Sequence, residues 1–507
     1  MHQFARVAAA QPFGIDGHIV TVEVDIARGM HHFSIVGMPA KAVEEARDRV
    51  GSALRNSNFS SPKHMQQKTV VSLAPAELRK HGAYFDLAIA IGYLLAAGEL
   101  TADTDSILFL GELALNGELQ PVRGALPLAQ AAAAAGYETV IIPEANAPEA
   151  AYVEAIAVVG ATTLGEVVRH LSGESPLPIT DPTPATSVVV PSVDMADVKG
   201  QEVAKRALLI AAAGGHNVAM IGPPGTGKTM LAKACRSLLP ELTREQALSV
   251  TAIHSVAGIL DASLVTDPPF RSPHHTASHV SIIGGGSVPR PGEITLAHHG
   301  ILFLDEFPEF DSQVIEALRQ PLEDRVVHIA RAHGSATFPA QMLLIAALNP
   351  CPCGFYGTTV QPCVCSPHAV RRYHKKLSGP IVDRIDLWVP VEHIDYEQLD
   401  SLKASGMSTI DLRQHISKAR ARQYDRFGST TRTNATMSAP DVTRCQLEPA
   451  ARDALRKSAA VLGLSPRAYH RMIKVAQTIA DLDESEIITS DHILEALQYR
   501  PKFTDTI

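Results

Sequence analysis

The sequence predicts an α/β protein of three domains: an N-terminal α/β domain, a central α/β core and a C-terminal helical lid. Three observations lead to this prediction. The chain has 507 residues, which is long for a single hydrophobic core. Strand-like and helical runs alternate up to about residue 390, and helical patterns with few strand signals follow. A segment with five prolines, 172–192, interrupts the alternation and is typical of a linker.

Residues 1–171 form the predicted N-terminal domain. Apolar runs of strand length alternate there with longer helical runs. The strand-like runs are 19–24, 68–73, 107–110 and 139–142, and the helical runs are 41–57 and 125–135.

The predicted core, 193–390, contains a glycine-rich motif, Gly-Pro-Pro-Gly-Thr-Gly-Lys-Thr at 222–229. It matches the G-x-x-x-x-G-K-[ST] pattern of phosphate-binding loops, and an apolar run before it and a helical run after it favour a nucleotide site over a chance match. The glycines let backbone N–H groups approach a β-phosphate, Lys228 reaches the β and γ oxygens, and the Thr229 hydroxyl is placed to ligate Mg²⁺. The residues expected to hold ATP are Gly222, Pro223, Pro224, Gly225, Thr226, Gly227, Lys228 and Thr229.

A second apolar run, 301–304, ends in two carboxylates. Asp305 is expected to hold Mg²⁺ through water, and Glu306 to polarise the water that attacks the γ-phosphate. The alternative is an exposed acidic pair, which the phosphate-binding loop disfavours. The next strand-like run leads to Asn349, which could orient the same water, and a buried capping asparagine is the alternative there.

Two arginines beyond the carboxylates are candidates for clamping the γ-phosphate. Arg384 is expected to come from a neighbouring subunit. Arg467 follows Ser465 as N-cap and Pro466 at the first helical position, so it lies in the first turn of a lid helix. Either arginine alone is more often a surface ion-pair residue. The predicted lid spans 391–507, with helical runs at 410–427, 448–462, 465–480 and 490–498.

Four cysteines, Cys351, Cys353, Cys363 and Cys365, fall within fifteen positions. Four thiolates complete a tetrahedral shell, so this cluster predicts a zinc site that braces its loop. Cys-x-Cys spacing is less common than Cys-x-x-Cys, which leaves free thiols as the alternative. His368 is a candidate substitute ligand.

The formal net charge of −8 excludes a globally basic surface, so any contact with DNA must be local. No segment has the roughly 18 uninterrupted apolar residues of a membrane span. The N-terminus also lacks the layout of a signal peptide, so we expect a cytoplasmic protein without a membrane partner.

These motifs resemble those of the ComM/YifB family of magnesium-chelatase-like AAA+ proteins, and the resemblance covers essentially the whole chain. The motifs that carry it lie at 222–229, 270–278, 291–298, 304–306, 349–354, 378–386 and 464–469. The resemblance implies the following roles: Lys228 and Thr229 as Walker A, Asp305 and Glu306 as Walker B, Asn349 as sensor 1, Arg384 as arginine finger and Arg467 as sensor 2.

The resemblance also implies a homo-hexameric ring that moves on single-stranded and branched DNA and promotes branch migration in natural transformation, with a recombinase as a candidate partner. The alternative is a motor that remodels a protein partner, as the magnesium-chelatase motor subunit does. A dedicated chelatase motor is expected to lack the N-terminal domain and the cysteine cluster, which favours the DNA motor.

The resemblance further implies an insert in helix 2 and a β-hairpin before sensor 1, both facing a central pore. The hairpin is expected over 325–338, with Arg331 and His333 at or near its tip, where they could contact DNA phosphates. An exposed tip without a partner is the alternative. Arg371 and Lys375 belong to a run of cations around an aromatic residue, which suits backbone contact and base stacking but equally a solvated helix face.

The first domain is similar to the Lon-protease-like (ribosomal S5 domain 2-like) domain of this family. Lon-type proteolysis requires a serine and a lysine. Tyr84 and Pro127 stand at the matching positions, and neither can perform that chemistry. We therefore expect this domain to support assembly or DNA passage.

Overall fold

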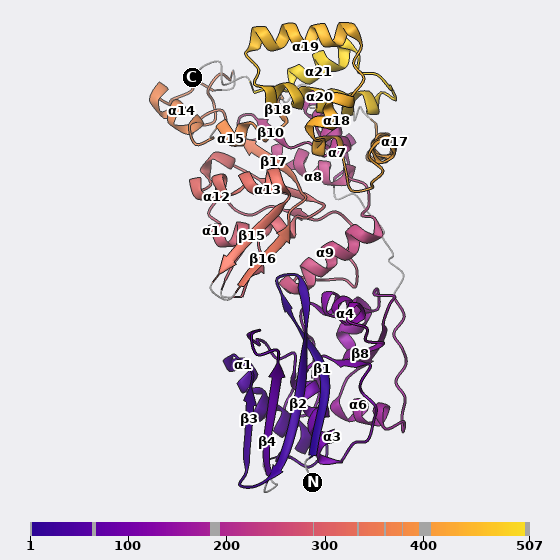
Figure 1. The fold of residues 1–507 in the computed structure, drawn as a ribbon. Coiled ribbons are helices and arrows are strands. Elements are labelled where there is room, and N and C mark those ends of the chain that lie inside the picture. The colour runs from indigo at the N-terminus through magenta and orange to yellow at the C-terminus, as the bar shows by residue number, and fades with distance from the viewer. Residues whose placement is uncertain are drawn as a thin grey trace.

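The structure is a computed structural model that describes residues 3–62, 67–182, 193–286, 288–331, 334–358, 361–377, 379–394 and 407–501. The N-terminal domain, the core and the lid follow one another along the long axis of the molecule (Figure 1). The predicted fold class, an α/β protein with a parallel-sheet core and a helical C-terminal region, is confirmed. The exact domain boundaries stay a prediction.

The N-terminal domain is built on a seven-stranded mixed sheet with the order β3-β4-β2-β1-β5-β8-β9. Its strands are β1 Gln3–Phe13, β2 Asp16–Arg28, β3 His32–Val36, β4 Gln67–Ala74, β5 Ile107–Phe109, β8 Thr139–Pro143 and β9 Ala157–Ala161. Two short strands, β6 Glu112–Leu113 and β7 Leu119–Gln120, pair beside it. Its α-helices are α1 Lys41–Glu44, α2 Ala46–Asn56, α3 Asp86–Ala97, α4 Ala125–Ala134, α5 Ala147–Ala150 and α6 Leu164–Leu171.

Helices cover both faces of this sheet, because successive side chains of a strand point to opposite faces. On β1, Val7 and Ala9 pack with residues of α2, α3 and α6, whereas Ala8 and Ala10 pack with residues of α4 and α5. The sequence runs did not predict β1 or α3, and the single helix expected over 41–57 is divided into α1 and α2.

The first part of the predicted linker lies along this sheet. The backbone N–H of Thr180 donates to the Val158 carbonyl at 2.8 Å, and Ile179 pairs with Val159 beside β9. Residues 183–192, the rest of the predicted linker, lie outside the described residues.

The core has a five-stranded parallel sheet with the order β11-β14-β17-β10-β18. Its strands are β10 Val218–Ile221, β11 Phe270–Arg271, β14 Ile301–Leu304, β17 Leu343–Leu348 and β18 Leu387–Pro390. The helices α7 Glu202–Gly214 and α8 Lys228–Leu238 share a hydrophobic cluster with Val218 and Met220, while Ala219 faces a second cluster on the other side. The phosphate-binding loop follows β10, which lies between β17 and β18 in the sheet.

Two hairpins extend from the core. The short strands β12 Gly284–Gly285 and β13 Arg290–Pro291 pair between the helices α10 His279–Ile283 and α11 Glu293–Leu296. The strands β15 Val326–Arg331 and β16 Gly334–Pro339 form an antiparallel hairpin where the sequence predicts one. A Cβ on Gly284 would lie 2.9 Å from Cδ1 of Ile329, so the two hairpins touch. His333 and the side chain of Arg331 lie outside the described residues.

The lid shares one hydrophobic cluster with the core, in which residues of α7 and α8 pack with residues of the lid helices. The lid helices are α17 Thr409–Phe427, α18 Ala439–Arg444, α19 Pro449–Leu462, α20 Pro466–Leu482 and α21 Ser490–Gln498. The four helical runs predicted for the lid correspond to α17, α19, α20 and α21.

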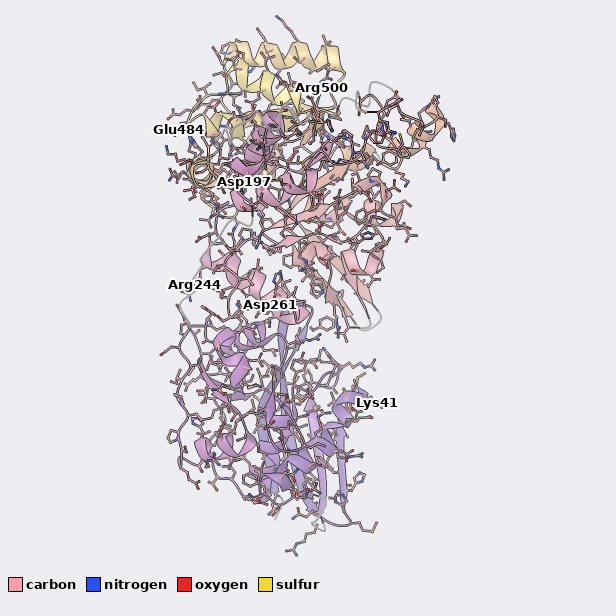
Figure 2. The ribbon with its side chains drawn as sticks, turned by 180° about the vertical axis from the view of Figure 1, so that it is seen from behind. Lys41, Asp197, Arg244, Asp261, Glu484 and Arg500 are labelled. Atoms are coloured by element: carbon pink, nitrogen blue, oxygen red, sulfur yellow. The ribbon has the colours of Figure 1, made fainter. Side chains whose placement is uncertain are left out.

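Described residues of the N-terminal domain contact the core at the β15–β16 hairpin and near residues 244–263. A Cβ on Gly334 would lie 2.7 Å from the ring of Phe13, so the β1–β2 turn meets the β15–β16 hairpin. The N–H of Gly124, before α4, donates to Oγ of Ser255 at 2.9 Å in the helix α9 Arg244–Ala257. Figure 2 shows Arg244 and Asp261 at this junction. Among the described residues, no helix combines the length and apolar character needed to cross a membrane.

Candidate active site

The phosphate-binding loop turns directly into α8. Gly225 and Gly227 have φ angles of 79° and 84°, a left-handed conformation that favours glycine. A Cβ on Gly222 would lie 2.1 Å from the carbonyl oxygen of Val391, so no larger residue fits there. The loop thus presents the N-terminal N–H groups of α8, which form a natural anion site.

Lys228 is enclosed within this loop, with 8% of its surface exposed. Its Nζ donates to the carbonyl oxygens of Gly222 at 2.7 Å and Pro223 at 2.8 Å, and to Oδ1 of Asn349 at 3.2 Å. Burial lowers the pKa of Lys228 to about 8, against the opposing effect of Asp305 and Glu306. The structure therefore brings the predicted lysine and the predicted sensor asparagine into contact.

The two carboxylates follow β14, whose four residues are all buried. Oδ2 of Asp305 accepts a hydrogen bond from the Thr229 hydroxyl at 3.0 Å. A carboxylate beside a hydroxyl is the donor set by which such loops hold Mg²⁺, so these two residues fit the predicted magnesium site. Glu306 has a φ of 50°, and its side chain is 50% exposed. Its carboxylate is thus open to solvent beside the phosphate-binding loop.

His275 lies against this glutamate, a contact that the sequence did not predict. Its Nδ1 is 3.2 Å from Oε2 of Glu306, and its ring lies 4.2 Å from the ring of His274. The histidine follows β11, which runs parallel to β14. Residues beyond the carboxyl ends of neighbouring parallel strands meet at one edge of the sheet. The strand pairing, which local sequence spacing does not reveal, brings the two residues together.

Arg384 and Arg467 lie together, away from the phosphate-binding loop. The guanidinium of Arg384 pairs with the carboxylate of Glu323, and Nη2 of Arg467 donates to Oε1 of the same carboxylate at 3.0 Å. The three side chains line a cavity of about 420 Å³. None of residues 222–229, all of which the structure describes, lines this cavity. Within one chain, the arginines are therefore separate from the group formed by Lys228, Thr229, Asp305, Glu306 and Asn349.

The four cysteines of the predicted zinc site come together. Their sulfur atoms all lie within 4.8 Å of one another. Cys351 Sγ is 3.3 Å from Cys353 Sγ and 3.7 Å from Cys363 Sγ. A tetrahedral site with Zn–S bonds of about 2.3 Å needs sulfur atoms about 3.8 Å apart, which this cluster approaches. His368 is exposed and is not part of the cluster.

The cysteine loop also contacts the phosphate-binding loop. Gly354 has a φ of 88°, and a Cβ there would lie 2.5 Å from Cδ of Pro224. The loop that would hold the metal is thus packed directly against a residue expected to bind nucleotide.

The burial of Tyr373 disfavours base stacking in the run around Arg371 and Lys375. Tyr373, the aromatic residue of this run, is only 5% exposed on the helix α14 Pro367–His374, because it packs inward. Arg371 and Lys375 are exposed and remain candidates for phosphate contact alone.

The positions that match the Lon-protease serine and lysine hold no catalytic pair. Burial raises the pKa of the Tyr84 hydroxyl to about 12, and Pro127 is buried within α4.

Three family models match the chain, and each is described by the ChlI subunit of magnesium chelatase. "Magnesium chelatase, subunit ChlI" matches residues 194–399, "Subunit ChlI of Mg-chelatase" matches 22–146, and "Magnesium chelatase, subunit ChlI C-terminal" matches 406–500. The chain is thus similar to this subunit in the N-terminal domain, the core and the lid.

Similar proteins extend over the full chain. "Competence protein ComM" of Haemophilus influenzae is 42% identical over 508 residues, which cover 98% of this chain and 97% of the relative. "Uncharacterized protein YifB" of Escherichia coli is 42% identical over 493 residues, covering 96% of this chain and 95% of the relative. "DNA replication licensing factor Mcm6" of Anopheles gambiae is 24% identical over 292 residues, which cover 56% of this chain and 32% of the relative. The chain therefore belongs to the ComM/YifB family of magnesium-chelatase-like AAA+ proteins.

Proposed function

We propose that this protein is an ATP-driven hexameric DNA translocase that promotes branch migration during recombination of incoming DNA in natural transformation. The observation that carries the proposal is the convergence of Lys228, Thr229, Asp305, Glu306 and Asn349 at one edge of the core sheet. The full-length similarity to a protein named for competence supports the biological setting. A cytoplasmic location belongs to the same proposal.

The residues at this edge divide the chemistry of ATP hydrolysis between them. The loop N–H groups and Lys228 bind the β- and γ-phosphates, and Mg²⁺ held by Thr229 and Asp305 neutralises phosphate charge when it is bound. Glu306 accepts a proton from the attacking water, and Asn349 orients that water. The close contact between Asn349 and Lys228 joins these roles in one group.

Arg384 and Arg467 complete the site from a neighbouring subunit. They lie away from the loop of their own chain and on a cavity of their own, so a ring in which one subunit's arginines face the next subunit's loop would use both. An arginine supplied in this way stabilises the charge of the transition state.

DNA would contact the two hairpins that extend from the core. The β12–β13 and β15–β16 hairpins touch one another, as Gly284 and Ile329 show. Arg331 and His333 stay the proposed contacts to the phosphates, with Arg371 and Lys375 as further candidates. Such contacts are independent of sequence and sensitive to salt, which suits movement along DNA. Single-stranded and branched duplex DNA are the proposed ligands, with a recombinase as the partner class.

A zinc ion bound by the four cysteines belongs to the same proposal. It would hold the loop that packs on Pro224, and so support the phosphate-binding loop from the side.

The second candidate is a motor that remodels a protein partner in the manner of magnesium chelatase. The descriptions of all three family models favour it. The sequence indicated that the N-terminal domain would favour the DNA motor over a chelatase motor. It does not, because the family model that matches residues 22–146 is also described as a magnesium-chelatase subunit. The full-length competence relative favours the DNA motor.

The test is ATP hydrolysis by the purified chain, measured without DNA and with single-stranded, duplex and four-way-junction DNA. We expect DNA to stimulate turnover and Glu306→Gln to abolish it. Glu309→Gln is the control, because Glu309 lies three residues away and pairs with Lys376 at 3.4 Å on the surface. Turnover that no DNA stimulates would reject the translocase.

A further inference from the structure

We propose that Glu323 is a positioning residue that holds Arg384 and Arg467 together as one unit for the neighbouring subunit's nucleotide. The inference rests on the proposed function, because it names a group on which the shared site depends. Glu323 belongs to the helix α13 Arg319–Asp324, which carries no nucleotide motif.

The geometry is that of one carboxylate between two guanidiniums. Oε2 of Glu323 pairs with Nη2 of Arg384, and Oε1 accepts from Nη2 of Arg467 at 3.0 Å. The two arginines come from segments 83 positions apart in the sequence, a loop of the core and the first turn of a lid helix. Glu323 is therefore a direct link between the core and the lid at this point.

Charge explains why such a link is needed. Two guanidiniums that must both reach one phosphate repel each other, and a carboxylate between them offsets that repulsion. The Arg384 guanidinium, with Arg467, lowers the pKa of Glu323, so the carboxylate stays ionised near neutral pH. Three further cations, Arg325, Arg471 and Lys474, and two further carboxylates, Asp383 and Asp386, line the same cavity, so positive charge stays in excess there.

The guanidinium of Arg384 and the helix that carries Arg467 are each held by further contacts. Nη1 of Arg384 donates to the carbonyl oxygen of Pro380 at 2.6 Å. One turn beyond Arg467, Nη1 of Arg471 donates to the carbonyl oxygens of Val382 at 3.3 Å and Ile385 at 3.0 Å, which ties α20 to the loop that carries Arg384. With α20 tied to this loop, Glu323 holds the Arg467 guanidinium and shares the Arg384 guanidinium with the Pro380 carbonyl.

Glu323 also stands at the base of the hairpin proposed to contact DNA. Only Asp324 and Arg325 separate it from β15, and Nη1 of Arg325 donates to the Met342 carbonyl at 3.1 Å. A shift of the arginines toward a neighbouring phosphate would therefore displace Glu323 and, with it, the residues at the start of β15. Loss of Glu323 is expected to weaken the coupling of DNA to turnover as well as turnover itself.

The experiment compares Glu323→Gln and the conservative Glu323→Asp with Glu316→Gln in the full chain. Glu316 lies in the preceding helix and pairs with Arg319 at 2.7 Å, so it is a matched surface control. We expect Glu323→Gln to lower kcat at least about tenfold with little change in KM for ATP, because the loop that binds ATP is intact. Glu323→Asp should recover part of the activity, and Glu316→Gln should match wild type.

Mixing separates a role toward the neighbour from a general loss of structure. In a homogeneous ring, Glu323→Gln is expected to keep at most about a tenth of wild-type turnover, and Lys228→Ala none. When they are mixed in equal amounts, about a quarter of the interfaces join an intact loop to an intact Glu323, and activity should reappear.

Arg384→Ala mixed with Lys228→Ala tests the shared site itself. Recovery in this second mixture but not in the first would overturn the role of Glu323 and leave the proposed function standing. Full activity of Glu323→Gln alone would also overturn the inference.

Discussion

At the scale of single residues, the candidate site depends on how Lys228 and Glu306 are held. Lys228 is bound by two loop carbonyls and by Asn349, so its ammonium is held within the loop expected to bind phosphate. Glu306 is held differently, since its carboxylate contacts His275 and is otherwise half exposed. The orientation of Glu306 is therefore the more adjustable of the two.

The first prediction concerns this contact. We expect His275→Ala to lower kcat by about tenfold while nucleotide binding is kept, because the alanine no longer orients the glutamate that activates water. Turnover and the affinity for a fluorescent ATP analogue are the measurements. His32→Ala is the control, because His32 is exposed at the start of β3 in the N-terminal domain. Unchanged kcat in His275→Ala would show that Glu306 is oriented without this histidine.

The residues of the site were unequally predictable from the sequence. Lys228, Thr229 and the carboxylates belong to local motifs whose spacing is set by one strand and one turn, so sequence alone locates them. Glu323 lies in no motif, and His275 lies in the 270–278 motif without a predicted role. They reach their partners through strand pairing and the packing of lid on core, which no local pattern contains.

At the scale of elements, the cysteine loop is the part most dependent on a ligand. Its four sulfurs converge from two Cys-x-Cys pairs, and the loop packs on Pro224 through Gly354. Four thiolates without a metal would repel one another, so the ion is expected to supply much of the loop's stability.

We predict about one zinc per chain in protein purified without chelator, measured by elemental analysis. Cys363→Ser should lose the metal and bind ATP more weakly, because the loop beside Pro224 is no longer held. Cys445→Ser should keep the zinc, since Cys445 lies in the lid, 4.0 Å from the sulfur of Met437. Metal-free wild-type protein would exclude the zinc site.

Two histidines before β14, His298 buried and His299 half-buried, make the core sensitive to acid. Burial lowers the pKa of His299 to about 4 and that of His298 well below its ordinary value. An unfolded histidine titrates near pH 6.5, so between about pH 6.5 and 4 the unfolded chain binds more protons than the folded chain. The free energy of unfolding must therefore fall as the pH falls through this window.

For His299 alone this effect amounts to about 2 kcal/mol at pH 5 relative to pH 7.5. Between pH 7.5 and pH 5, the free energy of unfolding should therefore fall by about 2 kcal/mol less in His299→Gln than in wild type. Urea unfolding can be followed by fluorescence, because the chain has one tryptophan and Trp388 lies in β18 of the core. His18→Gln, on an exposed position of β2, should behave as wild type. Equal losses of unfolding free energy in His299→Gln and wild type would contradict the lowered pKa of His299.

Elements were predicted well where the pattern is strong and local. The helices α17, α19, α20 and α21 and the strand β14 have clear apolar periods, and their observed bounds lie within about two residues of the predicted ones, whereas the short helix α18 was not predicted. The strand β1 was not predicted, because its alanine-rich sequence has low strand propensity. It forms because eleven residues pair in register with β2.

At the scale of the whole molecule, the N-terminal domain contacts the core, and the core contacts the lid. The lid shares a hydrophobic cluster with the core, and the N-terminal domain touches both α9 and the β15–β16 hairpin. The arginines that complete the proposed site lie apart from the loop of the same chain. This arrangement fits a ring in which hydrolysis at each interface moves the hairpins of adjacent subunits.

The most direct test of this account is ATP-dependent processing of a labelled four-way DNA junction. We expect the wild-type chain to convert the junction into its two-duplex products when ATP and Mg²⁺ are present. Glu306→Gln should bind the junction and leave it intact, because water activation is lost. An intact junction with the wild-type chain, under conditions in which that chain hydrolyses ATP, would contradict the account.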